Sequence, residues 1–189
     1  TASGDDSGIS VSLTGDGAFV AIGASEHSSG RGQARVFQYV ADSWVQVGDS
    51  MVGEAGDKSG LFVAIADDGR RVAVSSHQSD AGGLVGSGLV RVFDYESASS
   101  SWVQVGPRIL GAAAGDFSGW ALDLSGNGER VVVGAKFNDA GGEQAGHVRS
   151  FEYSAHMDAW EQVGPDINGQ AAGDTAGASV ATCGSGQRV

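Results

Sequence analysis

The chain has 189 residues, a formal net charge of −12 at pH 7, and 32 glycines. A chain this acidic is a poor candidate for binding nucleic acid or an anionic membrane surface. No apolar run approaches the roughly 18 residues that a membrane-spanning helix needs, so we expect no membrane insertion. The hydrophobic share of 41% is enough to bury a core, which argues against disorder. Cys183 is the single cysteine, which excludes an internal disulfide.

Within each repeat of the chain, the pattern predicts four short strands. In the first repeat, apolar residues alternate with period two over residues 9–13, and a Gly-Asp-Gly turn follows. A nearly continuous apolar run covers residues 19–24, as in a strand that is covered on both faces. The third strand is an Arg-x-Phe-x-Tyr segment over residues 35–39, and the fourth begins at Trp44. The corresponding first three strands of the later repeats are residues 61–65, 72–76 and 91–95, then 120–124, 131–135 and 149–153.

Three motifs recur in the same order and define this repeat. The motif Gly-Asp-x-Ser-Gly starts at residues 4, 56 and 115, with a weaker copy at residue 173. The Arg-x-Phe-x-Tyr segment and a Trp-x-Gln-Val-Gly segment follow it each time. We therefore predict one repeat domain over residues 1–189, with blade repeats at approximately 4–55, 56–114 and 115–172 and a partial repeat at 173–189.

Four antiparallel strands in a repeat of about 58 residues are typical of a β-propeller blade. A blade that is apolar on both faces must stack on neighbours to bury its surface. We predict an all-β fold of β-propeller type, with three full four-stranded antiparallel blades and a partial fourth. Propellers close with about four to eight blades. The chain is thus expected to belong to a longer chain or to associate with other copies, head to tail if it forms filaments.

Residues 7–11, 20–24 and 131–135 carry a resemblance to a known family. Their order, Ser-Gly-x-Ser-Val followed by Val-Ala-x-Gly-Ala, resembles the FG-GAP repeat of integrin α subunits and of secreted adhesion proteins. The Trp-x-Gln-Val-Gly segment is similar to repeat-rich extracellular proteins of microbes and algae. The resemblance implies an extracellular or cell-surface location. FG-GAP blades often bind Ca²⁺. The turns at residues 14–17 and 66–69 are too short and too poor in oxygen ligands for that ion. We therefore expect no cofactor and no metal.

Three sets of polar and aromatic residues recur once per repeat. The aspartates could form a cation-binding ring, but Asx turns that accept backbone N–H groups are the preferred interpretation. The arginines are expected to pair with carboxylates or carbonyls between blades, although acidic ligands are an alternative. The tryptophans are expected to pack between blades, with a sugar-stacking platform as the alternative. These residues are Asp5, Asp57, Asp116 and Asp174; Arg35, Arg91 and Arg149; and Trp44, Trp102 and Trp160.

No catalytic constellation emerges from the sequence. The four histidines share no metal-ligand spacing, and no Gly-x-Ser-x-Gly elbow followed by an acid and a histidine is present. Cys183 is interpreted as an inert buried thiol in the context of a second strand. Trp120 breaks the repeat, because Ile9 and Leu61 occupy the same position in the other blades, and it is expected in the core or facing a neighbouring blade.

The connections between the second and third strands vary most among the repeats, over residues 25–32, 77–88 and 136–146. Repeat proteins often place such insertions on one binding face. These loops are therefore either a partner surface or solvated connectors, and their candidate partner-binding residues are His77, Asp80, Lys136 and Asp139.

The leading interpretation is a non-enzymatic extracellular structural or adhesion module, with a filament or other homo-assembly as one form. Its partners would be copies of itself or the remainder of a longer chain. One alternative is a propeller that binds glycans or proteins through these loops, and the last is a propeller hydrolase or lyase.

Overall fold

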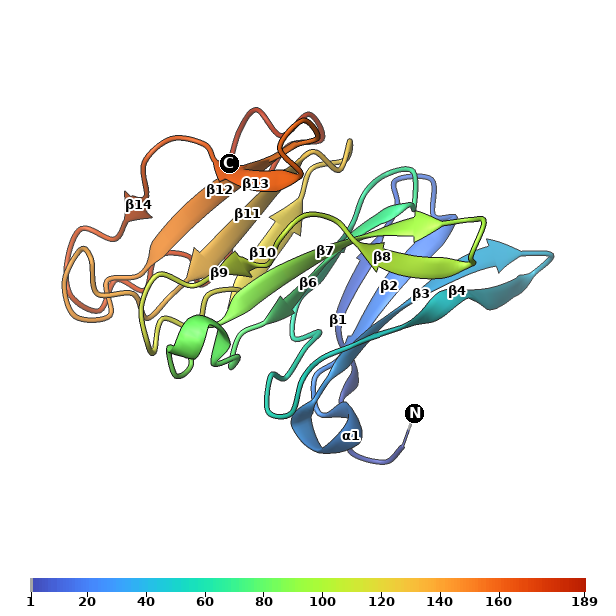
Figure 1. Cartoon of the computed structure of the whole chain (residues 1–189), viewed down its shortest axis with the longest axis horizontal. Coiled ribbons are helices and arrows are strands. Elements are labelled where there is room, and N and C mark those ends of the chain that lie inside the picture. The colour runs from blue at the N-terminus through green and yellow to red at the C-terminus, as the bar shows by residue number, and fades with distance from the viewer. Residues whose placement is uncertain (1) are drawn as a thin grey trace.

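The computed structural model describes residues 2–189, which form three antiparallel sheets that we call blades 1 to 3 (Figure 1). Blade 1 contains β1 (Ser7–Leu13), β2 (Phe19–Ala24), β3 (Gln33–Val40) and β4 (Ser43–Val52). Blade 2 contains β5 (Val63–Ile65), β6 (Arg71–Ser76), β7 (Leu89–Glu96), β8 (Ser101–Gln104) and β9 (Ile109–Leu110). Blade 3 contains β10 (Ala121–Leu124), β11 (Arg130–Ala135), β12 (His147–Ser154), β13 (Ala159–Gln162) and β14 (Ile167–Asn168). The predicted all-β fold with antiparallel blades is confirmed.

The outermost strand differs among the blades. In blade 1, β4 is continuous, whereas in blades 2 and 3 the chain leaves the sheet and returns as a short separate strand, β9 or β14, on the same neighbour. The interruptions contain Pro107 and Pro165, and blade 1 has Asp49 at that position. Proline cannot donate a ladder hydrogen bond, which explains why the strand stops there.

Two short helical turns lie in the loops between the second and third strands, where no helix is expected from the sequence. They are α1 (His27–Gly30) and the 3₁₀ turn η1 (Ala81–Gly83). Among residues 2–189, no helix is long and apolar enough to cross a membrane.

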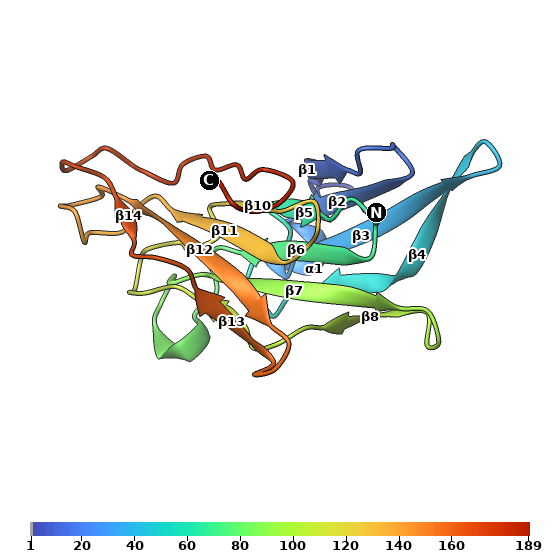
Figure 2. The same cartoon turned by 90° about the horizontal axis from the view of Figure 1, so that it is seen from above.

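The blades stand side by side, with β1, β5 and β10 along one side of the molecule and β8 and β13 along the other (Figure 2). The inner strand β5 contacts both β1 and β10. Side chains alternate across a strand, so Val72 and Val74 of β6 enter the core between blades 1 and 2, while Ala73 enters the core between blades 2 and 3. Burial on both faces explains the apolar run Val72–Val74 in the middle of β6.

The second and third copies of the Gly-Asp-x-Ser-Gly motif and the weaker copy at residue 173 each join the preceding blade through a parallel bridge. The bridged pairs are Gly32 with Ser59, Gly88 with Ser118, and Gly146 with Ala176. The last glycine of the motif packs directly on the preceding blade: Gly60 has a φ of +88°, and a Cβ there would lie 2.3 Å from the carbonyl oxygen of Gln33. A side chain at this position would both clash and strain the backbone.

The partial fourth repeat, residues 173–189, contains no strand but packs on blade 3. The Thr182 N–H donates to Asp123 Oδ2 at 2.7 Å, and Arg130 Nη1 donates to the Gly186 carbonyl at 2.7 Å. The prediction that Cys183 is a buried thiol in a second strand is wrong. Cys183 precedes the hairpin turn and is half-buried, and hydrogen bonds, first from Ser185 and then from the backbone, lower its thiol pKa to about 7.

Candidate functional site

The recurring aspartates close turns at the start of each repeat. Each carboxylate accepts a backbone N–H from a residue that precedes it by three positions, at 2.7–3.1 Å. Asp116 also accepts a bond from the Asn138 amide at 2.9 Å, and Asp5 lies 3.0 Å from His27 Nδ1. One oxygen of each carboxylate thus accepts a hydrogen bond within the protein itself. Among residues 2–189, no group of three or more His, Cys, Asp or Glu side chains could hold a metal ion.

The arginines that recur in blades 2 and 3 contact the outermost strand of the preceding blade. Arg91 Nη2 donates to the Val52 carbonyl at 3.1 Å, and the equivalent Arg149 donates to the Leu110 carbonyl at 2.7 Å. Arg35 in blade 1 donates to the Ser7 hydroxyl at 3.3 Å, and Arg91 and Arg149 make the same bond to the equivalent hydroxyls of Ser59 and Ser118.

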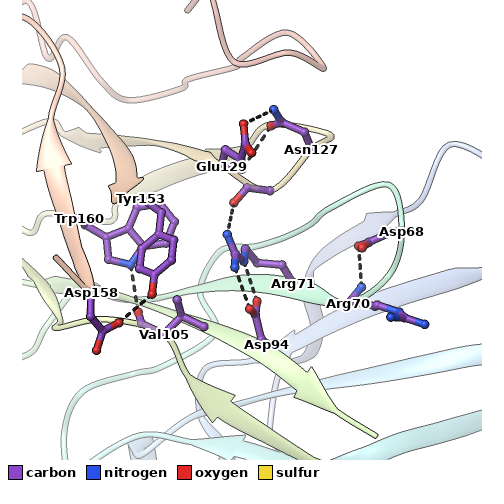
Figure 3. A network of polar contacts seen from close by, with 11 residues as sticks. Asp68, Arg70, Arg71, Asp94, Val105, Asn127, Glu129, Tyr153, Asp158 and Trp160 are labelled. Carbon is purple, nitrogen blue, oxygen red and sulfur yellow. Dashed lines mark hydrogen bonds and ion pairs between the residues drawn. The ribbon is translucent and has the colours of Figure 1, made fainter. Parts of the chain in front are cut away.

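The tryptophan indoles reach back to the preceding blade. Trp102 Nε1 donates to the Val47 carbonyl at 2.8 Å, and Trp160 Nε1 donates to the Val105 carbonyl at 3.0 Å (Figure 3). Trp44, in blade 1, is 48% exposed. Where these tryptophans have a preceding blade, they hold the blades together.

The residues that break the repeat gather on the face of the blades where the second strands end. We call this group the aromatic–cation cluster. Its members come from the variable third position of Gly-Asp-x-Ser-Gly, from the residue after that motif, and from the first two loop residues after each second strand. The cluster consists of Glu26, Lys58, His77, Phe117, Trp120, Lys136 and Phe137.

Trp120 is the centre of this cluster. The His77 ring meets the indole edge to face at a centroid distance of 5.6 Å, and the Phe137 ring lies at 5.7 Å in a similar geometry. The Lys136 ammonium lies 3.2 Å from the centroid of the indole and 4.6 Å from that of Phe137. A cation over an aromatic face is attracted by the ring quadrupole. The indole therefore holds an imidazole and an ammonium group in one small volume.

His77 is 4% exposed, and its Nδ1 has no hydrogen-bond partner. Burial disfavours the charged imidazolium and is the main reason that the pKa of His77 falls to about 4. The positive charge of Lys58 lowers this pKa further, while Glu26, which pairs with Lys58, opposes the shift. Burial also lowers the pKa of the Lys136 ammonium. At neutral pH the cluster thus contains a neutral imidazole and, on the same indole, the Lys136 ammonium.

Lys58 and Phe117 occupy equivalent positions in their repeats, and both adopt a left-handed backbone conformation, with φ of +50° and +49°. This conformation costs a non-glycine residue about 1–3 kcal/mol and persists only where the surroundings impose it. It directs the variable side chain of each motif into the gap between two blades. The motif is therefore a structural device that presents a different side chain at each junction.

The loop residues predicted from the sequence divide into two groups. The structure brings His77 and Lys136 together on Trp120. Asp80 and Asp139 remain in their own loops, where they accept bonds from the backbone N–H groups of Gly86 and Gln144 at 2.8 and 2.7 Å.

The sequence reasoning missed Glu26, Lys58, Phe117 and Phe137. A signal for them exists, because they occupy aligned positions at which every repeat has a different type of residue.

Comparisons with known proteins identify the fold. No protein-family model matches the chain, and no curated protein matches it either. A solved structure from Bacteroides fragilis, described as a candidate 6-phosphogluconolactonase, is similar with a TM-score of 0.56 and 14% identity over 85% of this chain and 40% of its own. A second such protein, from Bacteroides uniformis, gives a TM-score of 0.56 and 13% identity over 84% and 40%. Sqt1 of Saccharomyces cerevisiae gives a TM-score of 0.56 and 12% identity over 86% and 35%.

At these identities the similarity shows the fold, which is of β-propeller type. The chain spans only 35–40% of the length of these structures. It thus corresponds to part of a propeller of their size.

These comparisons correct two interpretations of the sequence. The resemblance to FG-GAP repeats is wrong, because two of the three similar structures are described as 6-phosphogluconolactonases and no family model matches the chain. The interpretation as a non-enzymatic adhesion or filament module is wrong as well, because two of the three structures are described as lactonases. Both errors have one physical cause. The recurring residues are those that every blade needs for stacking, so they report the architecture and not the activity.

Proposed function

We propose that the chain supplies part of a β-propeller hydrolase that opens the ring of a sugar lactone, and that the aromatic–cation cluster is where it acts. The observation that carries this proposal is the neutral imidazole of His77, with its unpartnered Nδ1, held beside lysines against the Trp120 indole. The description of two similar propellers as 6-phosphogluconolactonases supports the reaction class.

Opening a lactone requires a water molecule to attack the carbonyl carbon while a base removes a proton from it. The carbonyl oxygen becomes an oxyanion, which collapses as the ring C–O bond breaks. The ring oxygen then takes up the proton, and the product is an open-chain hydroxy acid, so that one water is consumed in total. In this scheme His77 is the base that receives and returns the proton.

The lysines supply the charge that this reaction needs. Lys58 and Lys136 place positive charge near His77, where an ammonium group can stabilise the oxyanion. The negative charge that develops on the substrate also favours the imidazolium, which offsets part of the cost that burial imposes on protonating His77. Trp120 offers an aromatic surface on which the ring of a sugar can stack.

The test uses glucono-δ-lactone as the probe, with acid release followed at constant pH and the spontaneous rate subtracted. We expect turnover by the unmodified chain and a loss of at least about 100-fold in His77→Phe, which keeps an aromatic ring against Trp120. Lys136→Met should also lower kcat, whereas Trp44→Phe, in blade 1, should not. A rate no higher than the spontaneous one, or an unchanged rate in His77→Phe, would refute the proposal.

A second function, carbohydrate binding without turnover, is favoured by a hollow of about 390 Å³ beside the cluster. Phe117, Phe137 and Asp139 are among the residues that line it. Aromatic faces with nearby carboxylates suit the C–H faces and hydroxyls of a sugar. In that case Phe137→Ala would abolish the binding of glucose measured by calorimetry, while His77→Phe would retain it.

A further inference from the structure

A second break in the repeat lies at the opposite end of the second strands. In blade 2, Arg71 forms a two-bond ion pair with Asp94 on the adjacent strand, with N···O distances of 2.6 and 2.7 Å. Its Nη1 also donates to the Gly128 carbonyl of blade 3 at 2.9 Å (Figure 3). Its guanidinium lies 5.2 Å from the centroid of the Tyr153 ring. We call this arrangement the arginine clamp.

Blade 3 repeats the clamp with its own residues. Arg130 pairs with Glu152 and donates to the Gly186 carbonyl of the partial fourth repeat. In both junctions, one arginine thus fills the space between two blades and neutralises an acid. The clamp is a property of the repeat and not of one site.

Blade 1 lacks the clamp. Phe19 occupies the position of Arg71, and Gln38 occupies the position of Asp94. The Phe19 ring packs on the next hairpin turn, since a Cβ on Gly69 would lie 2.4 Å from it. An aromatic ring cannot donate to a carbonyl or pair with an acid, so Phe19 makes no equivalent polar contact across the junction between blades 1 and 2.

The result is a groove of about 590 Å³, within the range of 300–1,000 Å³ typical of small-molecule sites. Its apolar wall includes Phe19, Val45, Val47 and Tyr95, and the Arg70 side chain lines its edge. By contrast, the hollow at the junction of blades 2 and 3 is about 400 Å³ and is lined mainly by charged and polar residues.

The groove is also unusual in its charge. The chain carries a net charge of −12, yet no aspartate or glutamate is among the residues that line this groove. Arg70 is exposed, and within the described residues its guanidinium has no ion pair or hydrogen bond. An unpaired cation at the edge of an apolar groove is complementary to a ligand that has an apolar body and one anionic group.

We propose that this groove is a ligand site for a small aromatic or alicyclic anion, separate from the aromatic–cation cluster. Phe19 begins strand β2, whereas Glu26 of the cluster follows the end of that strand. At about 3.3 Å per residue, the two places lie roughly 20 Å apart. A ligand in the groove therefore neither contacts the cluster nor competes with its substrate.

The test uses two fluorescent probes that share one apolar body. 8-Anilinonaphthalene-1-sulfonate carries a sulfonate, and N-phenyl-1-naphthylamine does not. We expect both to bind the unmodified chain. Arg70→Gln should weaken the sulfonate about fivefold and leave the neutral amine unchanged, because it removes charge and little apolar surface. His77→Phe should change neither, which separates this test from the fate of the proposed lactonase.

The decisive variant rebuilds the clamp. The double substitution Phe19→Arg with Gln38→Asp copies Arg71 and Asp94, and it should abolish the binding of both probes while the midpoint of urea unfolding stays equal or rises. If that variant does not fold, Val45→Asp gives the answer. Val45 is 53% exposed and tolerates a polar side chain, and the new carboxylate should repel the sulfonate but not the amine. Sulfonate binding that survives in the folded rebuilt variant, or in Val45→Asp, would overturn the proposal.

Discussion

Protonation of His77 should destabilise the folded chain, and the surroundings of the imidazole determine by how much. The imidazole is buried against Trp120, and burial together with the charge of Lys58 lowers its pKa from 6.5 to about 4. The unfolded chain, with the higher pKa, binds the proton between these two values. The free energy of unfolding is therefore highest above about pH 6.5 and falls as the pH decreases toward 4. At about pH 4.5 the loss from this one group is about 2.5 kcal/mol.

The assay is urea unfolding of the unmodified chain and of His77→Phe, at about pH 7.5 and again at about pH 4.5. The phenylalanine variant retains the aromatic contact but cannot be protonated, and carboxylates that titrate in both proteins cancel in the comparison. The unmodified chain should lose about 2.5 kcal/mol more than the variant over this interval. Lys136→Gln should reduce that loss, because Lys136 also lowers the pKa of His77. Equal losses in the unmodified chain and in His77→Phe would refute this account of the cluster.

Two further predictions concern the junctions and turns of the blades. Trp102→Phe removes the hydrogen bond from the indole to the Val47 carbonyl and should lower the free energy of unfolding by about 1 kcal/mol. Trp44→Phe, at a half-exposed position, should change that free energy by less than about 0.5 kcal/mol. Urea titration of both variants measures the difference, and equal effects would contradict the role of Trp102 in holding the blades together. Asp116→Ala leaves the Asn138 amide and a backbone N–H without their acceptor and should lower the free energy of unfolding by about 2 kcal/mol or more. A thermal unfolding midpoint that does not fall would show that the carboxylate does not stabilise its turn.

The repeat pattern was sufficient to predict the strands. Alternation over residues 9–13 and the apolar run over 19–24 correspond to β1 and β2, because local side-chain periodicity decides where strands form. The break in the outermost strand was also readable in principle, since Pro107 stands at the interruption in blade 2. The position of Cys183 was misjudged by alignment to the wrong strand, and not for lack of a signal.

The candidate site could be predicted only in part. His77 and Lys136 were selected from the sequence as loop residues, but so were Asp80 and Asp139, and nothing in the sequence separated the two pairs. Their separation depends on which loop side chains point across a junction and which turn back onto their own backbone. That choice is made by contacts between residues far apart in the chain.

The sequence by itself determined that the chain is an all-β repeat protein of propeller type, because every blade needs the same turns, apolar strands and junction residues in order to stack. Only the tertiary structure decided which residues meet at the junctions. It placed Trp120 between His77 and Lys136, and it left a groove where Phe19 replaces an arginine. The physical reason is that strand formation is governed by local periodicity, whereas the contents of a gap between two blades depend on side chains contributed by both.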